Sequence, residues 1–493
     1  MSDFRKLVKH SSHYFGGKLG VMLLGFVSFP LFTRLLSVEE YGFMALITQV
    51  VLLCTTVAKL GFQHSMQRFH REKVGGDEQE RQSYYSTTLF ATVFVAVGVV
   101  CVFLAAILLL PLHIDPRLHA GLLVASGLIF IRALRSMVNN LLQIESKTVA
   151  FNVIEIASKA GTVIGAVWLL FRWEHSVRAF FIATTAVETI ALGTMFYYLL
   201  RGSLIRVRAV SGKFLVTMIT FGVPMMWSEL AQVLLDSGDR VLIQYFVGAT
   251  ALGYYAAAYG VAYYLNDLLI GSLNLAFVPI CMEILEADGE ESLKRFIARS
   301  LKNYILVSCG IVAITVATSR DMLVILASRK YEHAHAIIPV VVIGMILASF
   351  HLFFRIGLFV RKKTVSLASL TTASMVLNLL LNVVLLPWIG VMGAAIATLL
   401  SFAIWIAATA WVSIKAFPVP FEFAAYARYA FVAGLAAAAG LLVHISHHWV
   451  EAAVRGCIVV CLYLGVLYLS DAHSRSIFGR SVHEVKRFAA TVG

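Results

Sequence analysis

Long apolar runs dominate the chain and alternate with short polar connections. A helix rises about 1.5 Å per residue, so a bilayer core of about 30 Å takes roughly 20 apolar residues. Runs of this length, rich in Leu, Ala, Gly and Val, suit helices, whereas a barrel needs short segments that alternate with period two. The pattern predicts an all-α polytopic membrane protein with about fourteen spans. The expected spans are 14–33, 41–65, 84–110, 119–142, 149–171, 178–200, 214–236, 251–281, 298–319, 336–358, 364–386, 391–414, 425–445 and 453–470.

Composition supports this class. The chain is 60% hydrophobic and 14% charged, against about 45–50% and about 25% in soluble domains. No stretch is long and polar enough to link separate soluble domains. The first run lacks a small-residue cleavage site before the second begins, so we interpret it as a retained span.

The positions of Lys and Arg predict the orientation. Most of the 40 fall in loops on the same side as the N-terminus, and cytoplasmic loops retain basic residues, so both termini are expected in the cytoplasm. The formal charge of +13 then reflects topology and attraction to anionic lipid. No aromatic-interleaved basic module indicates binding to nucleic acid.

One outer turn recurs along the chain. In RLLSVEEYG (34–42), Ser37 and Glu40 have the spacing of a capping box, which predicts a helix start after a tight turn. The stretch LLSVEEYGFMA (35–45) matches FVGATALGYYA (246–256), again between two apolar runs.

A second match has nearly the same spacing. The stretch HSVRAFFIATTAVE (175–188) matches IGVMGAAIATLLSF (389–402), at the outer turn between the fifth and sixth spans of each half. Two such matches predict two parallel six-span halves with two spans appended. Parallel repeats of this kind build transporters in which the substrate lies between the halves and access alternates by rocking. The predicted domains are 1–212, 213–416 and 417–493.

Three stretches carry a family resemblance: FPLFTRLLSVEEYG (29–42), DRVLIQYFVGATALGYYAAAYG (239–260) and LNLLLNVVLLPWIGVMGAAIATLLSF (377–402). They resemble the polysaccharide-lipid, Wzx-like flippases of the multidrug/oligosaccharidyl-lipid/polysaccharide exporter superfamily. The resemblance covers essentially all the expected spans and implies a V-shaped pair of helical bundles.

The resemblance also implies a function. Such a protein moves undecaprenyl-diphosphate-linked oligosaccharide across the bacterial inner membrane for exopolysaccharide, capsule or O-antigen assembly. It implies coupling to a gradient of H⁺ or Na⁺ and no other cofactor. The implied partners are the lipid-linked substrate, membrane lipids, a polysaccharide polymerase and a chain-length regulator.

Charged residues inside the spans are the candidate ligands. Each costs at least about 2.5–3.5 kcal/mol on insertion scales, so it needs a partner, a route to the interface or a wet cavity. A diphosphate accepts strong charge-assisted hydrogen bonds, for which the guanidinium fork is well shaped. We predict these diphosphate ligands: Arg132, Arg135, Lys59, Lys159, Lys18 and Arg355.

Some of these cations have a structural alternative. Glu155 and Lys159 lie four residues apart on one span and can neutralise each other. Arg355 and Lys18 can extend to the inner interface. Arg132 and Arg135 share one helix face, continued by Asn139. To reach the inner interface, these two arginines and Lys59 would have to extend farther than Arg355 and Lys18.

A second set of candidates would bind sugar or a coupling cation. Tyr255, Tyr259, Tyr263 and Asp267 recur every four residues and so share one helix face. Aromatic faces suit stacking on sugar rings, and Asp267 suits a hydroxyl group or a cation. The alternative is packing and the interfacial aromatic belt. The other acids in this set are Glu229, Asp236 and Glu155.

No catalytic or metal-binding residues are predicted. His444, His447 and His448 cluster near one outer turn, without a carboxylate at a suitable spacing. The chain has no phosphate-binding Gly-rich loop, nucleophile elbow or zinc-protease motif. A secondary transporter is therefore expected, and not an enzyme.

Three other functions remain open. A lipid II flippase and a multidrug exporter belong to the same superfamily, although a pump for cationic drugs favours acidic cavities. A membrane polysaccharide polymerase or glycosyltransferase would use Glu39 and Glu40 as catalytic carboxylates, but no large outer loop is available to hold its substrates.

Overall fold

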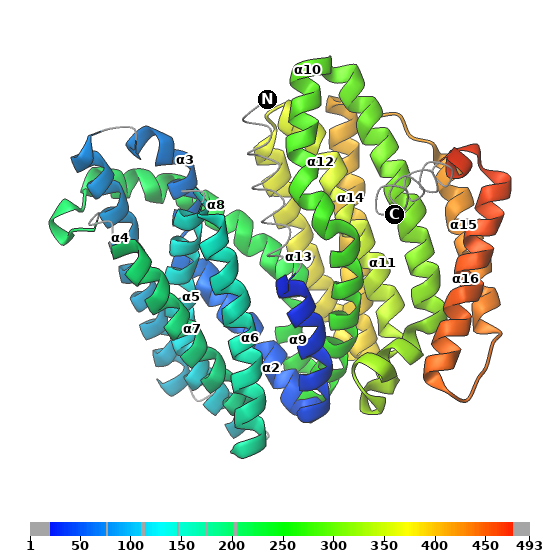
Figure 1. The fold of residues 1–493 in the computed structure, drawn as a ribbon, viewed down its shortest axis with the longest axis horizontal. Helices are drawn as coiled ribbons and strands as arrows, with labels where there is room; N and C mark the ends of the chain where they lie inside the picture. The colour runs from blue at the N-terminus through cyan, green and yellow to red at the C-terminus, as the bar shows by residue number, and fades with distance from the viewer. Residues whose placement is uncertain are drawn as a thin grey trace, which may run out of the picture. The chain divides into compact units, whose positions relative to one another are not determined.

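The computed structural model describes residues 20–74, 77–109, 114–144, 147–173, 176–200 and 205–476. Every regular element within these ranges is helical, so the predicted all-α class is confirmed (Figure 1). The α-helices are α2 (Val38–Lys59), α3 (Phe62–Val74), α4 (Glu78–Leu109), α5 (Pro116–Ile144), α6 (Thr148–Arg172), α7 (Val177–Leu200), α8 (Gly212–Ser237), α9 (Asp239–Phe246), α10 (Ala249–Leu326), α11 (Ile337–Ser349), α12 (His351–Val360), α13 (Thr364–Ile389), α14 (Val391–Ala416), α15 (Phe423–Leu441) and α16 (His448–Ser470).

In the described ranges, twelve helical segments are long and apolar enough to cross a membrane, so the protein is a multi-pass membrane protein. The expected number of fourteen is not confirmed. The first expected span is described only as the shorter apolar helix Gly20–Leu35. The expected spans 251–281 and 298–319 both fall within the 78-residue helix α10, which breaks at Gly289, where φ is 79°.

The second expected span ends earlier than predicted. Helix α2 stops at Lys59, Leu60 and Gly61 adopt positive φ, and the polar helix α3 follows. A Cβ on Gly61 would lie 2.0 Å from the carbonyl oxygen of Gly222 on α8. This close backbone approach fixes the turn, and hydropathy alone does not reveal it.

The described residues divide into two compact units. Unit 1 extends to residue 256 and includes 371–394, and unit 2 comprises 257–370 and the residues from 395 onward. The expected domains 1–212, 213–416 and 417–493 remain predictions.

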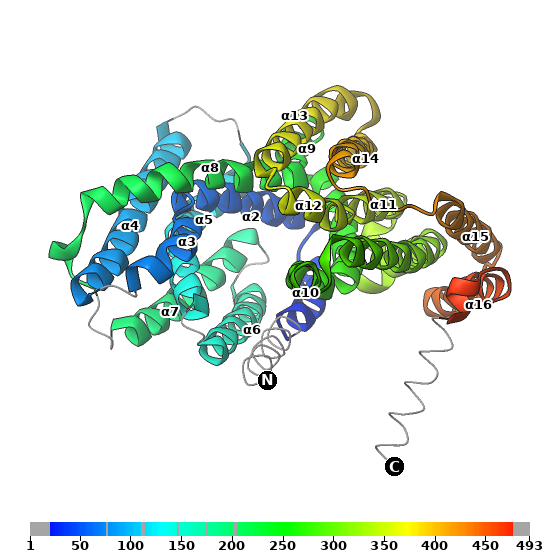
Figure 2. The same cartoon turned by 90° about the horizontal axis from the view of Figure 1, so that it is seen from above.

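Helix α5 lies at the centre of unit 1. It packs against α2, α4 and α7, and α6 packs against α7 (Figure 1, Figure 2). Helix α8 contacts α2, α3 and α4. A buried cluster that includes Met66, Tyr84 and Phe214 joins these elements, and the Tyr84 hydroxyl donates to the Met66 carbonyl at 2.7 Å. The buried aromatic ring thus has its polar end satisfied.

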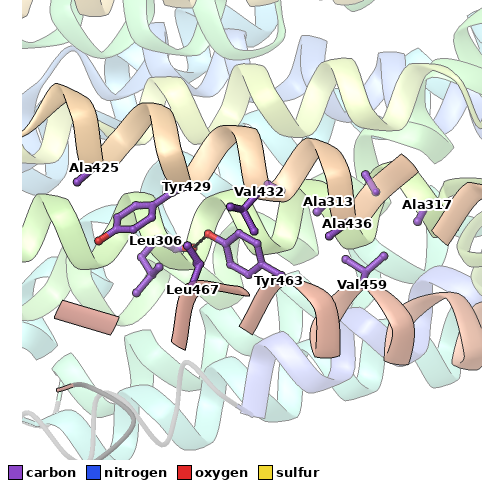
Figure 3. Close-up of a cluster of buried hydrophobic side chains, with 12 residues drawn as sticks. Leu306, Ala313, Ala317, Ala425, Tyr429, Val432, Ala436, Val459, Tyr463 and Leu467 are labelled. Atoms are coloured by element: carbon purple, nitrogen blue, oxygen red, sulfur yellow. Dashed lines mark hydrogen bonds between the residues drawn. The ribbon is translucent and has the colours of Figure 1, made fainter. Parts of the chain in front are cut away.

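In unit 2, the two C-terminal helices pack on α10 through small and aromatic residues (Figure 3). Ala313, Ala317 and Ala436 allow close backbone approach, as is typical of helix contacts in membranes. The Tyr463 hydroxyl donates to the Leu306 carbonyl at 2.7 Å.

The turn before α2 begins with a side-chain cap. The Ser37 hydroxyl accepts from the Glu40 amide at 3.1 Å and caps α2. The Glu40 carboxylate, 4% exposed, accepts a hydrogen bond from the Val177 amide at the start of α7. One outer turn is therefore tied to the next, and Glu40 has a structural role.

Arg117 connects the same turn to the loop before α5. Its guanidinium pairs with Glu39 at 2.8 Å and with Asp115 at 2.9 Å. The hydrogen bond from Arg117 holds the pKa of the Asp115 carboxyl below its usual range.

The two adjacent glutamates provide a matched test of this turn. We expect Glu40→Ala to lower the free energy of unfolding by about 1–3 kcal/mol, because it leaves the buried Val177 amide without an acceptor. Glu39→Ala removes the same charge from an exposed side chain, and its expected cost is below about 0.5 kcal/mol. Thermal unfolding of purified protein in detergent measures both. Equal losses would show that charge alone matters here.

Candidate functional site

A cavity of about 450 Å³ opens in unit 1 among side chains of α5, α6 and α7. It lies near the end of α5 and the start of α6, because Gln143 and Phe151 line it. All but one of its lining residues have polar or charged side chains. The lining residues are Arg132, Arg135, Ser136, Asn139, Asn140, Gln143, Phe151, Glu155 and Glu188.

Two arginines of α5 line this cavity, and each is held by a carboxylate. The Arg132 Nε lies 3.1 Å from both carboxylate oxygens of Glu188, and its Nη2 lies 2.8 Å from Oε1. The Arg135 Nη2 lies 2.8 Å from Oε1 of Glu155, and its Nη1 lies 3.9 Å from Oε2 of Glu188. The three-residue spacing brings both guanidinium groups to one face, as the sequence predicted.

Asn139 extends the polar face by one turn. Its side-chain amide donates to Glu155 at 2.9 Å, while its side-chain oxygen, Oδ1, is buried and has no hydrogen-bond partner among the described residues. A buried acceptor of this kind costs free energy unless a ligand or water satisfies it.

Lys159 on α6 is a third cation near this cavity, although it is not one of the residues that line it. It has no carboxylate within 4.0 Å in the described part of the chain, although Arg132 repels it and Glu188 attracts it. Glu155 pairs with Arg135, so the structural alternative in which Glu155 neutralises Lys159 is not what the structure shows. Three cations therefore face two carboxylates, which leaves an excess of positive charge.

Lys59 lies in a different cluster and does not line this cavity. Its ammonium contacts Oε1 of Glu229 on α8. The Gln63 amide lies 2.7 Å from the other carboxylate oxygen, and the His64 ring lies 3.5 Å from it. A phosphate that bound Lys59 would have to compete with Glu229.

The two remaining candidate cations lie elsewhere. Lys18 falls outside the described residues. Arg355 is on α12 in unit 2, where its guanidinium lies 5.9 Å from the centre of the Phe359 ring. Its Nε is buried without a hydrogen-bond partner, and no described carboxylate lies within 4.0 Å of it. Its role as a phosphate ligand stays a prediction.

The tyrosine face of α10 is largely covered. Tyr255 is fully buried and its hydroxyl donates to Asp239, and Tyr259 is buried as well. Tyr263 is 55% exposed, and Asp267 is half-buried. Period four gives a common face, but only Tyr263 of these three rings is open to a ligand. On α8, the Asp236 carboxylate accepts from Gln232 at 3.0 Å.

The structure brings together one ionic cluster that the sequence analysis missed. Asp321, fully buried on α10, contacts His448 Nδ1 at 2.7 Å and Arg455 Nη1 at 3.2 Å. Arg455 also pairs with Glu451 at 2.5 Å. The donor atoms of Asp321, His448 and Glu451 are close enough for a metal ion, but Arg455 binds both carboxylates. The spacing of His448, Glu451 and Arg455 along one face of α16 is the signal that the sequence offered.

Comparisons with known proteins agree with this fold. The family model described as "Polysaccharide biosynthesis protein" matches residues 31–336. No protein with a curated description matches the chain at a significant level.

Three solved structures share the fold. The chain is similar to the lipid II flippase MurJ in an inward closed conformation, with TM-score 0.76, 13% identity, and 95% of this chain and 99% of that one covered. It is also similar to a multidrug resistance MATE family transporter of the MOP superfamily. The inward-facing conformation gives TM-score 0.67, 14% identity, and coverage of 81% and 94%. The outward-facing conformation gives TM-score 0.61, 12% identity, and coverage of 83% and 94%.

The family match covers more than half of the chain, and the resemblance found in the sequence is confirmed. The protein belongs to the polysaccharide biosynthesis protein family and has the helical fold of MOP-superfamily flippases and transporters.

Proposed function

We propose that the protein translocates undecaprenyl-diphosphate-linked oligosaccharide from the cytoplasmic to the periplasmic leaflet of a bacterial inner membrane. The observation that carries the proposal is the cavity of unit 1, which Arg132 and Arg135 line with their partners Glu188 and Glu155, while a third cation, Lys159, lies near Arg132 and Glu188. Membership of a polysaccharide biosynthesis family supports a glycan as cargo.

The chemistry of the cavity suits a diphosphate that must bind and then leave. Phosphate oxygens accept paired hydrogen bonds from guanidinium groups, and the unpaired Lys159 adds a point charge. Glu155 and Glu188 hold the arginines in place before the ligand arrives and compete with it afterwards. Such competition limits the affinity, so that the headgroup can be released on the other side.

In the proposed transport cycle, two parallel halves alternate access by rocking, and both termini lie in the cytoplasm. The coupling ion is H⁺ or Na⁺, and no other cofactor takes part. The embedded acids Glu155, Glu229, Asp236 and Asp267 are the candidate coupling sites. The exported unit then passes to a polymerase and a chain-length regulator. In this proposal the protein acts as a secondary transporter and not as an enzyme.

Lipid II transport is the second candidate. The observation that favours it is the TM-score of 0.76 to the lipid II flippase MurJ over 95% of this chain. Lipid II and an oligosaccharide precursor share the polyprenyl diphosphate, so the same cavity chemistry serves either one. The two candidates differ in the sugar and in the consequence of losing the protein.

Deletion of the gene followed by complementation tests the proposal. We expect deletion to abolish surface polysaccharide, to accumulate its lipid-linked precursor in the inner leaflet and to leave cell-wall synthesis intact, and the intact gene to restore export. Arrest of cell-wall synthesis with lysis would instead support lipid II transport. Unchanged polysaccharide, together with lost resistance to organic cations, would contradict both and indicate drug export.

A further inference from the structure

A second cavity, of about 920 Å³, lies in unit 1 and shares no lining residue with the first. Its walls come from α3, the start of α4, residues 206–211 and the start of α8. The loops on this side carry the excess of Lys and Arg that predicts the cytoplasmic face. The cavity therefore opens at the depth of the inner headgroup layer or of the cytoplasm.

Three cations line this second cavity. Arg206, Arg208 and Lys213 are exposed. None of them has an acidic group within 4.0 Å in the described part of the chain. Unpaired cations that converge on one cavity create a positive potential, which attracts and concentrates anions.

The backbone that carries these cations is fixed in place. The Arg206 amide donates to the Ser86 hydroxyl at 2.9 Å, and the Ser211 amide donates to the Thr87 hydroxyl at 2.9 Å. Ser86 and Thr87 are fully buried on α4. Between these two bonds, residues 207–209 form a short 3₁₀ turn. A fixed backbone lowers the entropy lost when a ligand binds.

The other lining residues of this cavity include aromatic, acidic and neutral polar side chains. Three aromatic residues also line the cavity, and the Phe214 ring contacts those of Phe69 and Tyr84. Two acids, Glu72 and Glu80, also line the cavity. Glu72 pairs with Arg68 at 2.9 Å. The neutral polar side chains Gln79, Gln82 and Ser83 also line the cavity and can donate to an oxygen-rich group.

We propose that this cavity is a binding site for a phosphate group at the cytoplasmic end of unit 1. The group belongs either to the headgroup of an anionic lipid or to a soluble phosphate compound, and the same cations recognise both. Topology alone requires positive charge on this side, but it does not require three unpaired cations on a fixed segment over one cavity. The site is independent of the transported cargo and does not rest on the proposed function.

The test compares two variants of the full-length protein that lose the same charge. The site variant is Arg206→Gln, Arg208→Gln and Lys213→Gln, which keeps the backbone bonds to Ser86 and Thr87. The control variant is Arg295→Gln, Lys362→Gln and Lys363→Gln, which removes basic residues of the same side that do not line the cavity.

Two probes distinguish the sources of phosphate. Native mass spectrometry counts phosphatidylglycerol bound to protein taken from phosphatidylcholine nanodiscs with increasing phosphatidylglycerol content. Thermal unfolding in uncharged detergent, at constant ionic strength, measures protection by inorganic phosphate. We expect the site variant to bind at least about tenfold more weakly than the wild type with one probe or both, and the control variant to change less than about twofold.

Each outcome is informative. Loss with phosphatidylglycerol alone assigns a lipid headgroup, and loss with inorganic phosphate alone assigns a soluble ligand. If both variants bound the probes equally weakly, the loss of binding would be due to general surface charge, and the proposal would be overturned. The absence of binding to the wild type with both probes would overturn it as well.

Discussion

Replacement of Gly253 by Ala is expected to lower the free energy of unfolding by about 2–3 kcal/mol. A Cβ at this position would lie 1.9 Å from the carbonyl oxygen of Val38 at the start of α2. The obstacle is backbone, which cannot rotate away as a flexible side chain can. Helices α2 and α10 would have to separate at their first turns.

The position is significant because it is one of two repeat-related glycines. Gly42 occupies the matching place in the first repeat, and a Cβ there would lie 2.3 Å from the Ala249 carbonyl oxygen. Because each glycine lacks a Cβ, the backbone of the other repeat can approach it closely. We expect Gly253→Ala also to reduce export, because the two outer turns can no longer meet.

Gly98 provides the control, since a Cβ there meets nothing within 4 Å. In a helix interior Ala is about 0.8–1 kcal/mol more favourable than Gly, so Gly98→Ala is expected to be neutral or stabilising. Thermal unfolding in detergent compares the two variants. Shifts of the same sign and size would refute the close-contact explanation for Gly253.

The second large effect concerns the first cavity. We expect the double variant Arg132→Gln/Glu188→Gln to reach wild-type protein levels and to lose more than about tenfold in polysaccharide export. The double change removes both members of an ion pair, so neither of these two charges is left without the other. If Arg132 served only to neutralise Glu188, this variant would transport normally.

A matched pair exists in unit 2, where Lys302 contacts Glu422. Neither residue lines the first cavity. The control Lys302→Gln/Glu422→Gln removes an ion pair of the same charge and is expected to retain export. Surface polysaccharide, measured at equal protein level, decides between the two variants. Loss in both would assign the effect to ion pairs in general.

The local part of this fold could be predicted from the sequence, because hydropathy and turn chemistry depend on neighbouring residues. The cap by Ser37 and the shared face of Arg132 and Arg135 are examples. Helix α3 was missed, because its start depends on the contact between Gly61 and Gly222.

Ion-pair partners were beyond sequence reasoning, since they are brought together only by packing. Pairing of Glu155 with Lys159, four residues along the same helix, was one alternative, but Glu155 pairs with Arg135 of α5. Lys59 pairs with Glu229, which lies 170 residues away in the sequence. The identity of the charged groups was predictable, but the network that they form was not.

Burial along a helix face was equally hard to predict. Tyr255 and Tyr263 share one face of α10 by period four, but the first is buried and the second is exposed. Periodicity shows which residues point together. It does not show how far a packed neighbour extends along the face.

Translocation by purified protein in liposomes tests the central claim most directly, that the cationic cavity of unit 1 carries a diphosphate headgroup. The cargo is labelled undecaprenyl-diphosphate-linked oligosaccharide, and the comparison lipid is the same chain and sugar without phosphate. We predict rapid transfer of the diphosphate lipid by the wild type, and at least about tenfold slower transfer by Lys159→Gln, which breaks no ion pair in the described part of the chain. Equal transfer of both lipids, or transfer unaffected by Lys159→Gln, would contradict the account.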